Sequence, residues 1–92
     1  MNVAANVEGK HILITGGGSG IGAASARVLS ARGATVGIAD LNEGNAKTLA
    51  EEIVAAGGKA YAVAVDVTES AQVKAMFDTA LSHNDKIDVI IN

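Results

Sequence analysis

Apolar residues follow two kinds of pattern along this chain, and the two patterns alternate. Nearly continuous apolar runs occupy residues 10–15, 34–39, 59–65 and 86–91. Runs without polar alternation are typical of strands in a parallel sheet, because helices cover both of its faces. These four segments are therefore predicted to be strands of one parallel sheet.

Between the runs, apolar residues recur every three or four positions, which is the spacing of one face of an amphipathic helix. The first helix is predicted over Ala23–Arg32, with Gly33 as its C-terminal cap. Asn42 is predicted to cap the second helix, which ends at Gly57, and Thr68 to cap the third. The predicted buried faces are Ile21, Ala24, Val28 and Leu29; Ala46, Leu49, Ala50, Ile53 and Val54; and Val73, Met76, Phe77, Ala80 and Leu81.

The resulting order, βαβαβαβ, predicts an α/β protein with a Rossmann-like, doubly wound parallel sheet and right-handed crossovers. Residues 1–92 are predicted to form one domain, of which residues 1–9 are a loose arm. Four strands are one half of such a sheet, and the last strand ends at Asn92 with an uncovered apolar edge. We therefore expect a truncated chain, only the N-terminal half of the full fold, which is marginally stable or associates when isolated.

Composition narrows the class of protein. The 92 residues are 49% hydrophobic and carry a formal net charge of −3, without the basic stripe of a nucleic-acid surface. No apolar run approaches the roughly 20 residues of a membrane span, and the N-terminus does not resemble a signal peptide. There is no cysteine, and neither His11 nor His83 has further ligands nearby in the sequence, so we expect no metal site. A cytoplasmic protein without nucleic-acid or membrane partners is the expectation.

The segment from Thr15 to Gly22 carries the candidate chemistry. Its sequence is Thr-Gly-Gly-Gly-Ser-Gly-Ile-Gly, and it joins the first predicted strand to the first predicted helix. Glycines let the backbone approach a ligand closely, and the N-terminus of the following helix offers free N–H groups to a phosphate. Asp40 ends the second predicted strand, where an acidic residue can bind ribose. This pattern predicts a dinucleotide site.

These residues resemble the short-chain dehydrogenase/reductase family. The segment 15–22 looks like the family motif T-G-x-x-x-G-I-G, and Asp40 and the pair Asp66-Val67 follow the second and third strands as in that family. The segment 88–92, Asp-Val-Ile-Ile-Asn, resembles the start of its D-x-x-x-N-N-A-G segment. The resemblance extends from about Gly9 to Asn92.

The resemblance implies a role for each of these positions. The glycine turn would hold the pyrophosphate and adenosine ribose, and Asp40 would bind the ribose hydroxyls. Asp66 and Val67 would flank the adenine, and Asn92 would stand beside the cofactor. The implied cofactor-binding residues are Gly16, Gly18, Ser19, Gly20, Ile21, Gly22, Asp40, Leu41, Asp66, Val67 and Asn92.

The implied cofactor is NAD, with NADP the less favoured alternative. A carboxylate at Asp40 suits a 2′-hydroxyl and repels a 2′-phosphate. Family members that prefer NADP usually carry a basic residue at one of two positions, which here hold the neutral Ser19 and Leu41.

The implied function is hydride transfer between NAD and an alcohol or carbonyl substrate, in a homo-oligomer that is usually a tetramer. The family's catalytic serine and Tyr-x-x-x-Lys pair have no counterpart here, because Tyr61 is followed four residues later by Val65. Tyr61 is therefore predicted to be a packing residue, and no catalytic residue is assigned. Two alternatives remain: a nucleotide-binding protein without catalysis, and an S-adenosylmethionine-dependent methyltransferase, whose G-x-G-x-G pattern residues 16–20 also satisfy.

Overall fold

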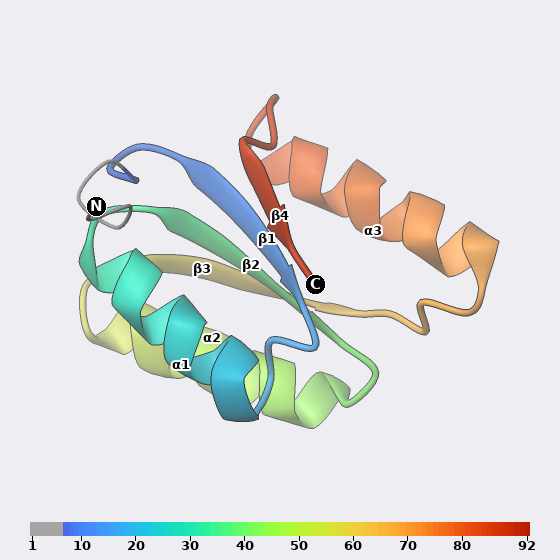
Figure 1. Ribbon diagram of the computed structural model, residues 1–92, viewed down its shortest axis with the longest axis horizontal. Helices are drawn as coiled ribbons and strands as arrows, with labels where there is room; N and C mark the ends of the chain where they lie inside the picture. Colours follow the sequence, from blue (N-terminus) through green and yellow to red (C-terminus); the bar gives the residue numbers. More distant parts are fainter. Residues whose placement is uncertain (1–6) are drawn as a thin grey trace.

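The structure is a computed structural model that describes residues 7–92, and it contains the predicted alternation of strands and helices (Figure 1). Every predicted element is present, with ends shifted by a few residues. The elements are β1 (His11–Thr15), α1 (Gly20–Ala31), β2 (Thr35–Asp40), α2 (Glu43–Ala55), β3 (Lys59–Ala64), α3 (Ser70–His83) and β4 (Val89–Ile91).

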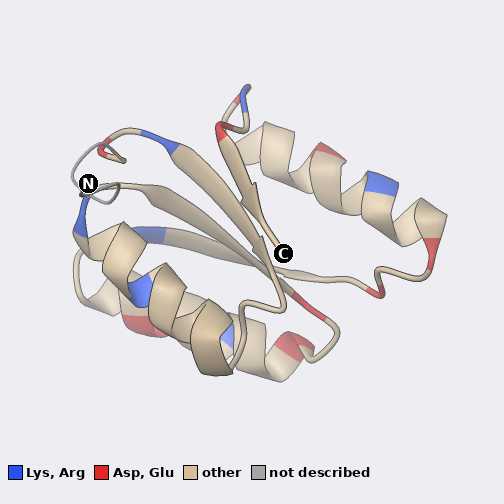
Figure 2. Cartoon of the chain, in the orientation of Figure 1, with Lys and Arg blue, Asp and Glu red and all other residues tan. Residues whose placement is uncertain are grey.

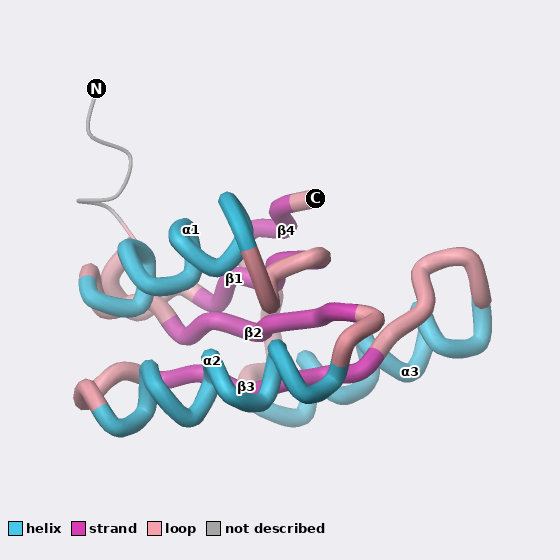
Figure 3. Tube along the Cα trace, turned by 90° about the horizontal axis from the view of Figure 1, so that it is seen from below, coloured by secondary structure: helices cyan, strands magenta, loops and turns pink. Residues whose placement is uncertain are grey.

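The four strands form one parallel sheet in the order β3-β2-β1-β4. Seen along the sheet, the strands follow one another in this order, with α2 beside β3 (Figure 3). The chain moves outward from β1 to β3 and then crosses back to place β4 on the other side of β1. This reversal is the switch point of a doubly wound sheet, so the predicted fold class is confirmed.

Two apolar clusters pack on the two faces of the sheet. One lies beneath α1 and α2 and includes Ile12, Ile14, Val36 and Ile38 from the strands. The other lies beneath α3 and includes Leu13, Ala39, Tyr61 and Met76. Alternate residues of β1 thus point to opposite faces, and both faces are apolar. This arrangement explains why the strands appear in the sequence as continuous apolar runs.

The predicted buried face of α1 is wrong except at Leu29, which is partly buried against the core cluster. Ile21 is 87% exposed and Val28 is 50% exposed, whereas Ala23, Ala26 and Ser30 face the sheet. Helix α1 begins at Gly20, three residues earlier than predicted. Small side chains let a helix lie close to a sheet, and this close packing determines which face of α1 is buried. Ile21 and Val28 therefore lie on the outer side.

Helices α2 and α3 follow their predicted patterns more closely. Ala46, Leu49, Ala50 and Ile53 of α2 are buried, but Val54 is exposed. Helix α3 buries Met76 and Ala80 and leaves Leu81 45% exposed.

The predicted helix caps have different outcomes. The Asn42 side chain accepts a hydrogen bond from the Asn45 backbone N–H, which confirms it as the cap of α2. The predicted cap of α3 at Thr68 is wrong. The N-cap of α3 is Glu69, whose side chain makes no capping bond. The Thr68 hydroxyl donates to Asp66 Oδ1 and does not cap the helix.

The predicted loose arm falls partly outside the described residues, because residues 1–6 are not described. For residues 7–9 the prediction is wrong. Val7 is buried in the cluster beneath α1 and α2, and the Gly9 N–H donates to the Gly33 carbonyl. This segment is therefore packed against the end of α1.

Strand β4 lies at the edge of the sheet, paired on one side only, with β1. It is shorter than predicted, beginning at Val89 instead of Lys86. Val89 is 43% exposed and Ile90 is 50% exposed. Association or marginal stability of the isolated chain stays a prediction. Within residues 7–92, no helix is long and apolar enough to cross a bilayer.

A buried polar network crosses the sheet beneath α3. The His11 ring is fully buried, and its Nδ1 donates to the Lys86 carbonyl at 3.0 Å. A carbonyl only accepts, so in the neutral ring Nε2 accepts from the Tyr61 hydroxyl, at 2.6 Å. The Tyr61 ring also stacks on His83, with centroids 4.0 Å apart. Tyr61 reaches from β3 to β1 across Gly37 of β2, where an added Cβ would collide with the phenol ring.

This burial makes Tyr61 a pH-dependent contributor to stability. Burial raises the pKa of Tyr61 to about 12, from an ordinary value of 10.0. The folded state therefore favours the neutral phenol, so its contribution is complete below pH 10 and is lost as pH rises from 10 toward 12. Tyr61 is the only tyrosine among these 92 residues, so the difference in phenolate absorbance between the unaltered protein and Tyr61→Phe should report this titration. A midpoint near 10 in the folded protein would contradict the assignment.

Candidate functional site

The residues predicted to bind a cofactor lie in the connections that leave the carboxyl ends of the four strands. The glycine turn follows β1, Asp40 ends β2, Asp66 lies two residues beyond β3, and Asn92 follows β4. Because the strands are parallel, these ends share one edge of the sheet. In open α/β sheets, ligands bind outside the carboxyl ends of the strands at the switch point.

The glycine turn is attached to the neighbouring strand and leads directly into α1. The Gly17 N–H donates to the Ala39 carbonyl at 3.2 Å, which ties the turn to β2. Gly20, the first residue of α1, has a φ of +57°, a conformation that other residues rarely adopt. The N-cap, Ser19, makes no side-chain cap bond, and the first N–H groups of a helix have no acceptor within it. These donors are available to an anion.

Gly22 closes the turn, and its lack of a side chain permits a close backbone contact. A Cβ at this position would collide with the Gly16 carbonyl oxygen and lie 2.9 Å from the Gly17 Cα. At Gly16 and Gly20, by contrast, an added Cβ would meet nothing within 4 Å. The turn is therefore closely packed where Gly22 meets Gly16 and Gly17, and it is open at the Cβ positions of Gly16 and Gly20. This shape suits a backbone cradle for a pyrophosphate.

Asp40 lies beside this turn. Its Oδ2 accepts the Gly18 N–H at 2.9 Å, and its Oδ1 accepts the Asn42 N–H at 2.9 Å. The Val65 N–H donates to the Asp40 carbonyl, which joins the ends of β2 and β3. The predicted ribose partner and the predicted phosphate cradle are thus in direct contact. The next residue, Leu41, is 75% exposed.

Asp66 makes no hydrogen bond to the other predicted site residues within the described part of the chain. Its Oδ1 accepts from the Thr68 hydroxyl at 2.6 Å and from the Thr68 N–H at 3.0 Å. These bonds, with the hydroxyl contributing most, hold the pKa of Asp66 below its ordinary value. The Asp66 N–H donates to Gln72 Oε1, and the neighbouring Val67 is 62% exposed. Asp66 therefore shapes the connection to α3, and Val67 offers an open apolar surface.

Asn92 is held by a residue that was not among the predicted site residues. The Thr15 hydroxyl donates to Asn92 Oδ1 at 2.6 Å, between the ends of β1 and β4. Thr15 is the first residue of the glycine motif, and this place in the motif is the one feature of the sequence that could have identified it as a site residue. The contact between Thr15 and Asn92 depends on the pairing of β1 with β4. A local sequence pattern contains no information on that pairing.

The charge at this edge of the sheet is acidic. Residues 16–22, 41–42 and 65–69 contain no lysine or arginine, whereas Asp40, Asp66 and Glu69 lie in or beside these connections. Figure 2 shows acidic segments at the end of β2 and between β3 and α3. A doubly charged 2′-phosphate would therefore meet like charge here.

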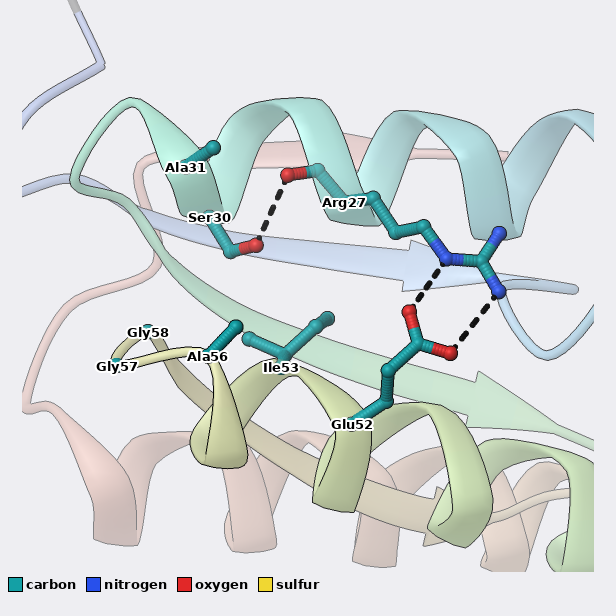
Figure 4. A pocket seen from close by; sticks show the side chains of 8 residues that line it. All are labelled: Arg27, Ser30, Ala31, Glu52, Ile53, Ala56, Gly57 and Gly58. Carbon is teal, nitrogen blue, oxygen red and sulfur yellow. Dashed lines mark hydrogen bonds and ion pairs between the residues drawn. The ribbon is translucent and has the colours of Figure 1, made fainter.

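A hollow between α1 and α2 lies at the other end of these helices (Figure 4). Arg27 and Glu52 bridge the two helices, with Nε to Oε2 at 2.7 Å. Both side chains are more than half exposed, so the pair contributes little to stability. The hollow contains none of the predicted site residues, and we assign it no ligand.

Comparison with known proteins shows the family of this chain. The profile of the family described as short chain dehydrogenase matches residues 10–92. The 7alpha-hydroxysteroid dehydrogenase of Escherichia coli (strain K12) is 36% identical over 86 residues, which cover 94% of this chain and 34% of that protein.

Two solved structures have a similar fold. A 7 alpha-hydroxysteroid dehydrogenase complexed with NADH and 7-oxo glycochenodeoxycholic acid gives a TM-score of 0.92 at 35% identity, covering 97% of this chain and 35% of that one. A 3-ketoacyl-(acyl-carrier-protein) reductase of Brucella melitensis, complexed with NADH, gives 0.86 at 41% identity, covering 92% and 34%.

The chain spans about a third of the length of these relatives. Within that span the profile match extends from the start of β1 to Asn92 and includes every predicted site residue. The chain belongs to the short-chain dehydrogenase family of oxidoreductases.

Proposed function

We propose that this chain supplies the cofactor-binding half of an NAD-dependent oxidoreductase that interconverts an alcohol and a carbonyl compound. The observation that carries the proposal is the contact between Asp40 and the glycine turn, which brings a ribose acceptor and a pyrophosphate cradle together. The turn and the start of α1 would bind the pyrophosphate, and Asp40 would bind the adenosine ribose. Val67 would lie beside the adenine and Asn92 beside the nicotinamide half.

When bound, the nicotinamide supplies the hydride chemistry, and the protein supplies binding and orientation. The residues described here hold the cofactor's adenosine and pyrophosphate. We assign none of them to proton transfer to the substrate. The homo-oligomeric assembly implied by the resemblance and the cytoplasmic location expected from the composition belong to the same proposal.

The preference for NAD over NADP is the sharpest test. Equilibrium titration of the protein at its natural length should give an affinity for NAD at least about fivefold higher than for NADP, because two like charges a few ångströms apart repel by about 1 kcal/mol even in water. Asp40→Ala should reduce this ratio, since it removes the charge that opposes the 2′-phosphate. Equal affinities in the unaltered protein would overturn the NAD assignment.

A nucleotide-binding role without catalysis is the second candidate. Within the described residues, the one tyrosine, Tyr61, is 7% exposed and donates to His11, so its hydroxyl is committed to the core. Turnover of alcohols with NAD by the natural-length protein would exclude this candidate. Binding of NAD without any turnover of alcohols or carbonyl compounds would favour it.

A further inference from the structure

The Asp40 carboxylate accepts hydrogen bonds from two N–H groups of the protein's own backbone. Each of its oxygens accepts one backbone N–H, from Gly18 on one side and Asn42 on the other, both at 2.9 Å. A carboxylate oxygen has two lone pairs, so each oxygen keeps one for a ribose hydroxyl. Ribose binding therefore does not require either backbone bond to break.

Gly18 is the point at which the turn meets helix α2. A Cβ on Gly18 would lie 2.8 Å from Asp40 Oδ2, 3.0 Å from the Asn45 Cβ and 3.1 Å from the Ala46 backbone N. The middle of the turn thus rests against the first residues of α2, and the Asp40 carboxylate bonds to it there. Between Gly17, which is tied to β2, and Gly20, which begins α1, two hydrogen bonds hold the backbone: the Gly18 N–H donates to Asp40, and the Ser19 carbonyl accepts from Ala23 inside α1. Only the first of them ties the turn to another part of the chain.

We propose that Asp40 is a positioning residue for the pyrophosphate as well as a partner for the ribose. Its carboxylate holds the Gly18 N–H, and through it the glycine turn, in the shape that receives the phosphates. This inference rests on the proposed function. A positioning role and a role limited to ribose binding predict different results for the nucleotide-free protein. Only the positioning role predicts that loss of the carboxylate disturbs the turn there.

The first test is hydrogen exchange of the Gly18 amide in the nucleotide-free protein at its natural length. Asp40→Ala removes both acceptors, and we expect exchange at Gly18 to accelerate on the order of tenfold or more, the loss of one charge-assisted hydrogen bond. Glu43→Ala is the matched control. Glu43 is an exposed acidic residue in the first turn of α2, and its side chain makes no hydrogen bond or ion pair within residues 7–92. It should leave Gly18 unchanged, and Asp40→Asn, which keeps one acceptor, should fall between.

The second test separates the turn from the ribose. NAD and an analogue with a 2′,3′-dideoxy adenosine ribose are titrated into the unaltered and Asp40→Ala proteins. If Asp40 positions the turn, the variant binds the analogue severalfold more weakly than the unaltered protein does, although no ribose hydroxyl remains to be lost. Equal affinity for the analogue in both proteins, or unchanged Gly18 exchange with unchanged thermal stability, would overturn the proposal.

The two hypotheses fail differently. If the unaltered protein does not bind NAD, the proposed function is wrong, while exchange at Gly18 still reports whether Asp40 holds the turn. If NAD binds and exchange at Gly18 is the same in Asp40→Ala as in Glu43→Ala, only the positioning role is wrong.

Discussion

Replacing Gly22 with alanine is expected to abolish measurable NAD binding and to destabilise the fold. The new Cβ would collide with the Gly16 carbonyl oxygen and press on the Gly17 Cα. Both are backbone atoms that no side-chain rotation can move aside. Either the turn opens or α1 shifts, and each change displaces the N–H groups that are proposed to bind the phosphates. Overpacking of this kind costs about 1–3 kcal/mol in stability. Nucleotide titration and chemical denaturation measure the two effects.

Gly44→Ala is the control for this substitution. Gly44 lies inside α2, and a Cβ there would meet only the Asn42 side-chain oxygen, at 3.4 Å. Alanine is favoured over glycine within a helix by roughly 0.5–1 kcal/mol, so this variant should be as stable as the parent or slightly more so. Unchanged NAD binding by Gly22→Ala would mean that the turn tolerates a side chain, and the cradle geometry described here would be wrong.

Ile38→Ala is expected to be the most destabilising truncation of a side chain next to the site. Ile38 is fully buried in the cluster beneath α1 and α2. Its Cγ2 also lies close under the glycine turn, 3.1 Å from where a Cβ on Gly17 would be. Removing a buried isoleucine to the Cβ typically costs about 2–5 kcal/mol, a large share of the 5–15 kcal/mol that stabilises an ordinary domain. The lost support should also weaken NAD binding.

Denaturant unfolding of the natural-length protein measures the first effect, with Val54→Ala as the control. Val54 is also apolar but is 54% exposed on the outer side of α2, so its truncation should change the free energy of unfolding by less than about 0.5 kcal/mol. Equal losses for the two variants would contradict the assignment of Ile38 to the core.

The sequence predicted the fold well because the decisive signals are local. Continuous apolar runs identified the strands, and the glycines of residues 16–22 identified the turn between a strand and a helix. The buried face of α1 could not be predicted in this way. Its larger apolar residues suggested one stripe, but the close approach of helix and sheet selects Ala23, Ala26 and Ser30. That choice depends on the sheet, which a helical periodicity does not contain.

The site was predicted as a set of positions, without its internal contacts. The carboxyl ends of parallel strands had to share an edge, so the co-location of Asp40 with the turn followed from the topology. The hydrogen bonds from Gly18 to Asp40 and from Thr15 to Asn92 join residues 22 and 77 positions apart. They depend on the exact register of the strands and on side-chain rotamers. Neither quantity is encoded in a motif.

The polar network beneath α3 carries a constraint on how this sequence can vary. Gly37 leaves room for the Tyr61 ring, and that ring satisfies a nitrogen of His11 two strands away. A larger residue at position 37 would displace the ring, and a smaller one at position 61 would leave the imidazole nitrogen without a partner. A substitution at either position alone should therefore destabilise the fold. Across the evolution of this lineage, positions 11, 37 and 61 should therefore change together, as one inherited unit.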